Sequence, residues 1–439
     1  MIVHEWGTFT ALFDEQGQQL SGINIDTEPV PGFVHNLDRY ILNDAVLTST
    51  HWIHRKKAVP RHHPSVSLRM ETPVIYFYPP QGMQLPQQVD VEVKFRGGWV
   101  TEFYPRAEVL FPLVKSGEFN FNDLSPQTVG QVAWRNLQIG TPETGPETDQ
   151  HVWLAPRKVA AANITSSEGE HEKYIFYRGV AQQRSPLLAF TQEQGAALSL
   201  AATFQNVLPA QQSVTIHNLW LMETRDDGLT AYRRLEALPV VNNDQPNRRI
   251  TVPRRFHAED FNASNRQRLE AEMKAAILRE GLFSDETEAL LSTWQQAYFA
   301  SPGLRVFYTV PREWTDHFLP LTISGKPKIT RVIIGRLELI SDSQRETLNQ
   351  LATAPVSKSE WLAKLPFNSP ALGKILAGHS EVGEIGVPIP ADFQLYLKLG
   401  RFRNALIAAE QQRLDATNLS QFIHEYQLEP FRLTQASGK

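Results

Sequence analysis

The spacing of apolar residues changes near His257, and this change constrains the fold of the chain more than any other feature. From Ser65 to about residue 255 the apolar side chains follow the patterns of β-strands, chiefly alternation at every second position. After His257 the residues Leu269, Met273 and Ile277 recur at intervals of four, which suits an α-helix. The sequence therefore predicts an α+β protein whose N-terminal region is a large antiparallel, sandwich-like β structure.

Three regions follow from this pattern. At 439 residues the chain is long enough for two or three hydrophobic cores. Residues 1–255 are predicted to form the β-rich region and to carry the functional site. Residues 256–340 are predicted to form a helical hairpin and further strands that pack on that region, and residues 341–439 to be helical. The second helix of the hairpin carries a stripe that is expected to lie in the core, formed by Leu290, Trp294 and Tyr298.

The β-rich region contains one clear hairpin pattern. Apolar and polar residues alternate from Val89 to Phe95, as in a strand with one exposed face, and residues 96–99 supply a turn toward a partner strand at residues 100–104. Residues 72–78 form a nearly continuous apolar run, and Pro73 predicts that this run begins a strand or lies at a sheet edge. Residues 120–149 are rich in Pro, Gly, Thr and Asn and are expected to be a connecting loop.

The opening run His4-Glu5-Trp6-Gly7-Thr8-Phe9-Thr10 is the densest concentration of titratable and aromatic residues. As an extended strand it places Glu5 and Phe9 on one face and His4, Trp6, Thr8 and Thr10 on the other. Gly7 predicts a bulge or a close backbone approach. Two interpretations stay open: either the run carries a site, or Glu5 pairs with a buried arginine and His4 is a hydrogen-bonded interior histidine.

Histidines cluster toward the N-terminus. Six of the 13 histidines lie within the first 63 residues, and the segment 51–63 carries four Lys or Arg residues and no acid. Imidazole binds zinc and copper at neutral pH, so this clustering favours a metal site, although a solvated basic loop explains the segment as well. The candidate metal ligands are His4, His51, His54, His62, His63 and His171.

Three carboxylates are the candidate catalytic groups, Glu5, Glu71 and Glu172. Glu71 lies two residues from Arg69 in an apolar segment, so it is either half of a buried ion pair, the commoner outcome, or a catalytic carboxylate. Glu102 is placed in a similar way on the next predicted strands. Glu172 follows His171 at a strand entrance, where a carboxylate suits a base or the hydrogen-bond partner of a metal ligand.

Composition narrows the class of protein. A formal charge of -4 argues against a dedicated nucleic-acid-binding protein. The chain has no cysteine, which removes disulfides, thiolate metal sites and a cysteine nucleophile. No apolar run is long enough to span a bilayer and no signal peptide opens the chain, so we expect a cytoplasmic protein without a membrane partner; a processed secreted form would show the same sequence. A homo-oligomer is compatible with this composition.

Four motifs together resemble a family of bacterial proteins for which no activity is established. They are the His4 to Thr10 run, Arg69-Met70-Glu71-Thr72-Pro73-Val74-Ile75-Tyr76-Phe77-Tyr78, Glu170-His171-Glu172-Lys173-Tyr174-Ile175-Phe176-Tyr177-Arg178-Gly179 and Pro311-Arg312-Glu313-Trp314-Thr315-Asp316. The resemblance covers most of the chain in the same order. It groups these residues and implies no reaction, and the segment 51–63 is longer and more basic here than the resemblance leads us to expect.

Three functions fit the sequence. The first is a metal-dependent enzyme, a zinc hydrolase or a copper oxidase, acting on a small molecule or a peptide. The second is a non-catalytic β-rich binding or assembly protein that uses its His, Arg and Trp residues for packing. The third is a metal-free hydrolase that uses paired carboxylates of Glu5, Glu71 and Glu102 in the manner of a glycosidase. The clustering of histidines favours the first.

Overall fold

The computed structural model describes residues 1–23, 30–36, 63–110, 124–192, 195–204, 207–209, 212–241, 248–365, 371, 374–375, 382–383 and 386–429. The chain divides into two compact units: Met1–Gln19, Val30–Leu37 and Ser67–Leu339 form the first, and Leu20–Pro29, Asp38–Val66 and Ile340–Lys439 form the second. The predicted boundary at residue 340 coincides with a change of unit, whereas the one at residue 255 falls within the first unit.

A single large sheet dominates the first unit. Its main path of strands runs β15-β14-β18-β20-β1-β3-β10-β5-β7-β4-β19, and 15 described strands take part in all. They are β1 (Ile2–Phe13), β2 (His35–Asn36), β3 (Leu68–Tyr78), β4 (Gln87–Arg96), β5 (Gly98–Tyr104), β6 (Glu108–Leu110), β7 (Val129–Ile139), β8 (Ile164–Thr165), β9 (His171–Glu172), β10 (Ile175–Ala181), β14 (Leu219–Thr224), β15 (Thr230–Arg234), β18 (Gly303–Thr309), β19 (Leu321–Ile323) and β20 (Lys328–Leu339).

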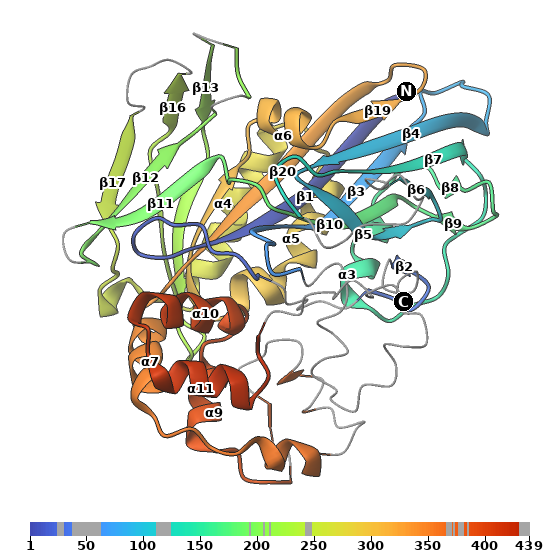
Figure 1. Cartoon of the computed structure of the whole chain (residues 1–439). Helices are drawn as coiled ribbons and strands as arrows, with labels where there is room; N and C mark the ends of the chain where they lie inside the picture. The colour runs from blue at the N-terminus through green and yellow to red at the C-terminus, as the bar shows by residue number, and fades with distance from the viewer. Residues whose placement is uncertain are drawn as a thin grey trace. The chain divides into compact units, whose positions relative to one another are not determined.

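The opening strand β1 lies near the middle of this sheet. It pairs in parallel with β20 over its whole length and antiparallel with β3. Figure 1 shows the dark-blue β1 running beside the orange β20. Eleven of its twelve residues are buried, so both faces of the strand are covered. The predicted α+β class with a large β-rich N-terminal region is confirmed.

Two smaller sheets complete the β structure of the first unit. One has the order β11-β12-β17 and the other pairs β13 with β16. Their strands are β11 (Leu187–Gln192), β12 (Ala197–Ala202), β13 (Ser213–Ile216), β16 (Leu238–Val241) and β17 (Arg249–Pro253).

The predicted helical hairpin is confirmed, and it covers one face of the large sheet. It consists of α4 (Asn265–Arg279) and α5 (Ser284–Thr293), with Gly281 between them at a φ of +103°. Leu269 and Met273 of α4 share a hydrophobic core with Trp6 of β1. After α5 the chain continues as a six-residue π-helix, η6 (Gln295–Ala300), on the same face. The first unit also contains α3 (His151–Leu154), η3 (Pro156–Lys158), η5 (Ala258–Asp260) and α6 (Arg312–Phe318).

The predicted hairpin of residues 89–104 is wrong in its pairing. Strands β4 and β5 form at the predicted residues, but β7 lies between them in the sheet. Gly97 has a φ of +80°, and Gly98 packs so closely on β10 that an added Cβ would lie 1.9 Å from the Val180 carbonyl oxygen. These two glycines let the chain cross to a new position in the sheet instead of turning back on itself.

The predicted loop over residues 120–149 is also wrong in part, because Val129–Ile139 forms the long strand β7. Its buried residues include Val132 and Trp134, then Leu137 and Ile139. Asn136, at a φ of +55°, lies where the register with β4 shifts. The bulge moves the buried side chains from even to odd positions, which hides the period of two.

The second unit is helical in its C-terminal part, as predicted. Gly400, at a φ of +75°, separates two of its helices. The described helices are α7 (Asp342–Thr353), the 3-10 helix η7 (Ser359–Lys364), α9 (Ala391–Lys398), α10 (Arg403–Leu414) and α11 (Thr417–Glu425). Among the helices of the described residues, none has both the length and the apolar character that a bilayer span requires.

The close packing at Gly98 generates a first prediction. We expect Gly98→Ala to lower the free energy of unfolding by about 2–3 kcal/mol, because backbone must move to admit the new methyl group. Urea denaturation followed by tryptophan fluorescence measures this. Gly32→Ala is the matched control, since an added Cβ there meets nothing within 4 Å. Equal midpoints for the two variants would contradict the role assigned to Gly98.

Candidate functional site

A bulge in β3 decides which side chains face the helices. Trp6 of β1 pairs with Val74, but Thr8 pairs with Glu71, so β3 has one residue more than β1 in this interval. The extra residue lies at Thr72–Pro73, and an added Cβ on Gly7 would lie 2.9 Å from Pro73 Cα. The close approach predicted at Gly7 is confirmed. Because a one-residue shift turns side chains to the other face, the bulge brings Glu71 onto the face that the helices cover.

Seven charged side chains form what we call the polar band on this helix-covered face. Thr8 and Thr10 of β1 lie within it. All seven residues are buried, with 1 to 8% of their surface exposed. The polar band consists of Arg69, Glu71, Glu102, Arg178, Arg305, Arg336 and Glu338.

The π-helix η6 supplies a tyrosine to the polar band. The Tyr298 hydroxyl donates a hydrogen bond to Glu71 Oε2, and the same phenolic oxygen lies 2.8 Å from Thr8 Oγ1. Thr10 Oγ1 donates to Glu71 Oε2 at 3.4 Å, and Arg69 Nε lies 3.8 Å from Glu71 Oε1. The Glu71 carboxylate is therefore held by hydroxyl groups on one oxygen and faces a guanidinium with the other.

Arginine 336 connects Tyr298 to the next part of the polar band. Its guanidinium carbon lies 4.2 Å from the centre of the Tyr298 ring, a cation–π contact. Arg336 Nε donates to Glu338, whose carboxylate is also 3.1 Å from Arg305 Nε. Arg305 in turn donates to the Tyr298 carbonyl oxygen. The tyrosine is thus fixed through both its ring and its backbone.

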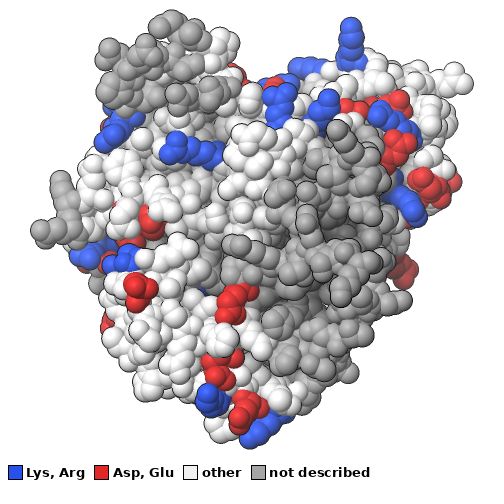
Figure 2. Space-filling model, in the orientation of Figure 1, with Lys and Arg blue, Asp and Glu red and all other residues white. Residues whose placement is uncertain are grey.

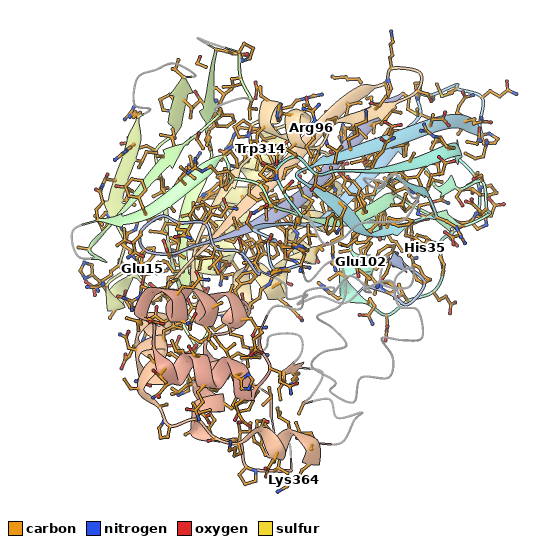
Figure 3. All side chains as sticks on the ribbon, viewed as in Figure 1. Glu15, His35, Arg96, Glu102, Trp314 and Lys364 are labelled. Atoms are coloured by element: carbon orange, nitrogen blue, oxygen red, sulfur yellow. The ribbon has the colours of Figure 1, made fainter. Side chains whose placement is uncertain are left out.

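Glu102 and Arg178 extend the polar band across the next two strands. Arg178 Nη1 lies 3.1 Å from Glu102 Oε2, and Asn36 of β2 pairs with Glu102. The next residue of β10, Gly179, pairs with Met70 of β3, the residue before Glu71. Figure 3 labels Glu102 on β5 and the neighbouring His35 on β2. Glu71 and Glu102 therefore share one face of the sheet with one strand between them.

The structure places Glu5, a predicted catalytic residue, on the opposite face of β1. Its fully buried carboxylate accepts hydrogen bonds from the Tyr177 hydroxyl and from Arg331 Nε. Arg331 Nη1 also donates to Asp316 of α6 at 2.8 Å. Burial, and then the charge of Glu5, raise the pKa of Tyr177 well above its ordinary value. The interpretation that Glu5 pairs with a buried arginine is confirmed, and Glu5 is separated by the sheet from Glu71.

His4 lies among aromatic rings under α5. Its Nδ1 is 2.7 Å from Glu286 Oε2, and its ring contacts those of Tyr78 and Phe283. Glu286 Oε2 also accepts the Phe283 backbone N–H, which helps to cap α5. Burial, and then the charge of Glu286, raise the pKa of Tyr78. The expected hydrogen-bonded interior histidine is confirmed, and it fixes the start of α5 on β1.

His171 and Glu172, which the sequence predicted as site residues, each contact a neighbouring side chain: His171 contacts Thr165, and Glu172 contacts Arg157. His171 Nδ1 lies 2.9 Å from Thr165 Oγ1. Glu172 is buried and accepts hydrogen bonds from Trp153 Nε1 at 2.7 Å and from Arg157 Nη2 at 2.6 Å. The His171 contact therefore joins the paired strands β8 and β9, and the Glu172 contacts join β9 to α3 and η3.

The structure describes only some of the predicted metal ligands. His51, His54 and His62 lie outside them. His63 is described, and its Nδ1 accepts the Ser65 backbone N–H at 3.1 Å. Within the described ranges, no group of three or more His, Cys, Asp or Glu side chains is arranged to hold an ion. A zinc or copper site therefore stays a prediction from the sequence.

Five members of the site were not predicted from the sequence: Arg178, Tyr298, Arg305, Arg336 and Glu338. Tyr298 is buried as predicted, but its hydroxyl end lies in the polar band. The usable signal was the pair Arg336 and Glu338 within the otherwise apolar strand of residues 332–340. Figure 2 shows both signs of charge interspersed on the described part of one face of the molecule. The charges of the polar band are buried instead.

The His4–Glu286 contact generates a second prediction. We expect a double-mutant cycle of His4→Ala and Glu286→Ala to give a coupling free energy of about 1–3 kcal/mol, because either single change leaves a buried polar group without its partner. Thermal and urea unfolding measure it. A cycle of the exposed pair Arg312 and Asp316, whose side chains are 52% and 46% exposed, is the control and should give less. Coupling at His4 no larger than the control value would refute the fixing role.

Neither a protein-family model nor a curated protein sequence matches this chain. The resemblance to a bacterial family with a His-Glu-Trp-Gly-Thr-Phe-Thr opening stays a prediction. The chemistry of the polar band is therefore the basis on which a function is proposed.

Proposed function

We propose that the chain is a hydrolase that works without a metal ion and uses Glu71 of the polar band as its general base. The observation that carries the proposal is the hydrogen bond from the Tyr298 hydroxyl to the Glu71 carboxylate, set among four arginines. Glu71 takes a proton from the attacking water as the bond from the scissile centre to the leaving group breaks. Tyr298, which orients the carboxylate, relays that proton to the leaving group, so that Glu71 is a carboxylate again at the end of the reaction.

The cost of burying charge supports a functional reading of the polar band. Removing charged groups from water is expensive, and well-packed apolar residues in their place often stabilise a protein as well or better. The rest of this sheet face has such apolar residues, among them Trp6, Tyr76 and Ile334. Buried charges that lower stability are typical of catalytic and binding sites.

Two backbone irregularities converge on Glu71 and Tyr298. The β3 bulge turns Glu71 toward the helices, and η6 is a π-helix in the stretch that presents Tyr298. Bulges next to active sites re-aim side chains, and short π-helical turns are frequent at functional sites. Both irregularities serve the same hydrogen bond, which favours a selected geometry.

A second carboxylate is available to assist Glu71. Glu71 and Glu102 lie on strands separated by one other strand, which puts their backbones roughly 10 Å apart. Paired carboxylates of inverting glycosidases stand about 6.5–9.5 Å apart. Of the three glutamates that the sequence suggested for a metal-free hydrolase, Glu71 and Glu102 lie on the same face of the sheet, and Glu5 lies on the other face.

Changing Glu71 tests this proposal. We expect Glu71→Gln to lower kcat/KM about 100-fold or more, because the amide keeps the size of the side chain but cannot take a proton. The substrate is found first with a panel of p-nitrophenyl glycosides and esters. Glu172→Gln is the matched control: another buried glutamate, bound to Arg157, whose loss should lower stability and leave kcat unchanged. Equal activity of Glu71→Gln and the unchanged chain would disprove the base.

Chelation separates this proposal from the metal-dependent enzyme. We expect the wild-type activity to survive dialysis against EDTA, because proton transfer at Glu71 needs no ion. Metal analysis of protein purified without an affinity tag accompanies the assay. Loss of activity on dialysis and its return with zinc or copper would restore the histidine-based prediction instead.

A further inference from the structure

We propose that the substrate of this site carries a carboxylate group, which Arg336 binds. This inference deepens the proposed function and rests on it, since it names the class of molecule on which Glu71 acts. It follows from the surroundings of the Arg336 guanidinium.

Arg336 is a buried cation, and one of its N–H donors has no partner among the described residues. Its side chain is 1% exposed, its Nε donates to Glu338, and one face of the guanidinium lies against the Tyr298 ring. Among the described residues its Nη1 has no hydrogen-bond partner. A buried charged donor without a partner is costly, so its retention indicates a ligand that takes the hydrogen bond.

The neighbours of Arg336 favour a planar anion. Thr10 of β1 pairs directly with Arg336 on one side and with Arg69 on the other, so these three side chains share a row on the same face. A guanidinium offers parallel N–H groups that match the two oxygens of a carboxylate. A carboxylate bound to Arg336 would lie next to Thr10 of β1, and the guanidinium of Arg69 would lie one strand further on, on β3.

The geometry connects this anion site to the proposed base. Tyr298 contacts Arg336 through its ring and Glu71 through its hydroxyl. A substrate whose carboxylate occupies Arg336 therefore extends along the tyrosine toward Glu71. Binding energy at Arg336 then positions the scissile bond at the base.

The charges that face Arg336 fit a single negative charge on the ligand. Glu338 accepts a hydrogen bond from Arg336, and Glu71 accepts one from the Tyr298 hydroxyl, whose ring packs against Arg336. The seven charged members of the polar band include four arginines and three glutamates, an excess of one positive charge. A monocarboxylate balances that excess, whereas a phosphate dianion adds repulsion from both glutamates.

Binding of small anions to the full-length chain tests the inference. The probes are sodium acetate for the carboxylate and inorganic phosphate for the alternative, with sodium chloride to match ionic strength. We expect acetate to bind saturably in calorimetry and to raise the melting temperature. Phosphate is expected to do neither. Arg336→Lys should weaken acetate binding about tenfold or more, because an ammonium lacks the planar fork.

Arg233→Lys is the matched control. Arg233 also lies 4.2 Å from an aromatic ring, that of Phe256, but it is outside the polar band. Its replacement should leave acetate binding unchanged. If Arg336→Lys does not fold, protection of Arg336 by acetate against phenylglyoxal, mapped by peptide mass spectrometry, replaces that variant.

Tyr298→Phe distinguishes this inference from the proposed function. It keeps the ring beneath Arg336 and removes the hydroxyl, so we expect hydrolysis to fall while acetate binding persists. Absence of saturable acetate binding to the wild-type chain overturns the carboxylate site, whatever the activity of Glu71→Gln. Binding of phosphate alone, or acetate binding that Arg336→Lys leaves intact, overturns it as well.

Discussion

The parallel pairing of β1 with β20 is the interaction on which the first unit depends. It joins residues 2–13 to residues 328–339, from the two ends of this unit, near the middle of one sheet. Every hydrogen bond along this pair closes a loop of more than 300 residues. Because closing so long a loop is entropically costly, the pairing forms only together with the folded structure of the residues between the two strands. The helices, the β3 bulge and the polar band all take their positions from it.

The two faces of β1 carry two separate buried polar networks. On one face Glu5, Tyr177 and Arg331 form a buried set that fixes α6 through Asp316. On the other face Thr8 and Thr10 meet Tyr298 and Glu71. Alternation of side chains along the strand keeps these networks apart. We therefore place the proposed chemistry on the second face, where two backbone irregularities and four arginines converge.

The role of a residue in the polar band is difficult to predict from the sequence. A carboxylate paired with an arginine in an apolar strand has the same pattern whether it is structural or functional. Glu172 and Glu71 look alike in sequence, yet Glu172 is held by Trp153 and Arg157, whereas Glu71 meets a tyrosine from a π-helix. The difference lies in a partner 227 residues away along the chain.

The sequence by itself determined the α+β class, the helical hairpin, the helical C-terminal part and the close approach at Gly7, because each depends on local spacing or on a residue's own conformational range. Only the tertiary structure decided that β7 separates β4 from β5, that Glu71 and Glu5 face opposite ways, and that Tyr298 and Arg336 join Glu71. Those outcomes depend on strand register and on contacts distant in sequence, and a single bulged residue reverses the face of every side chain beyond it.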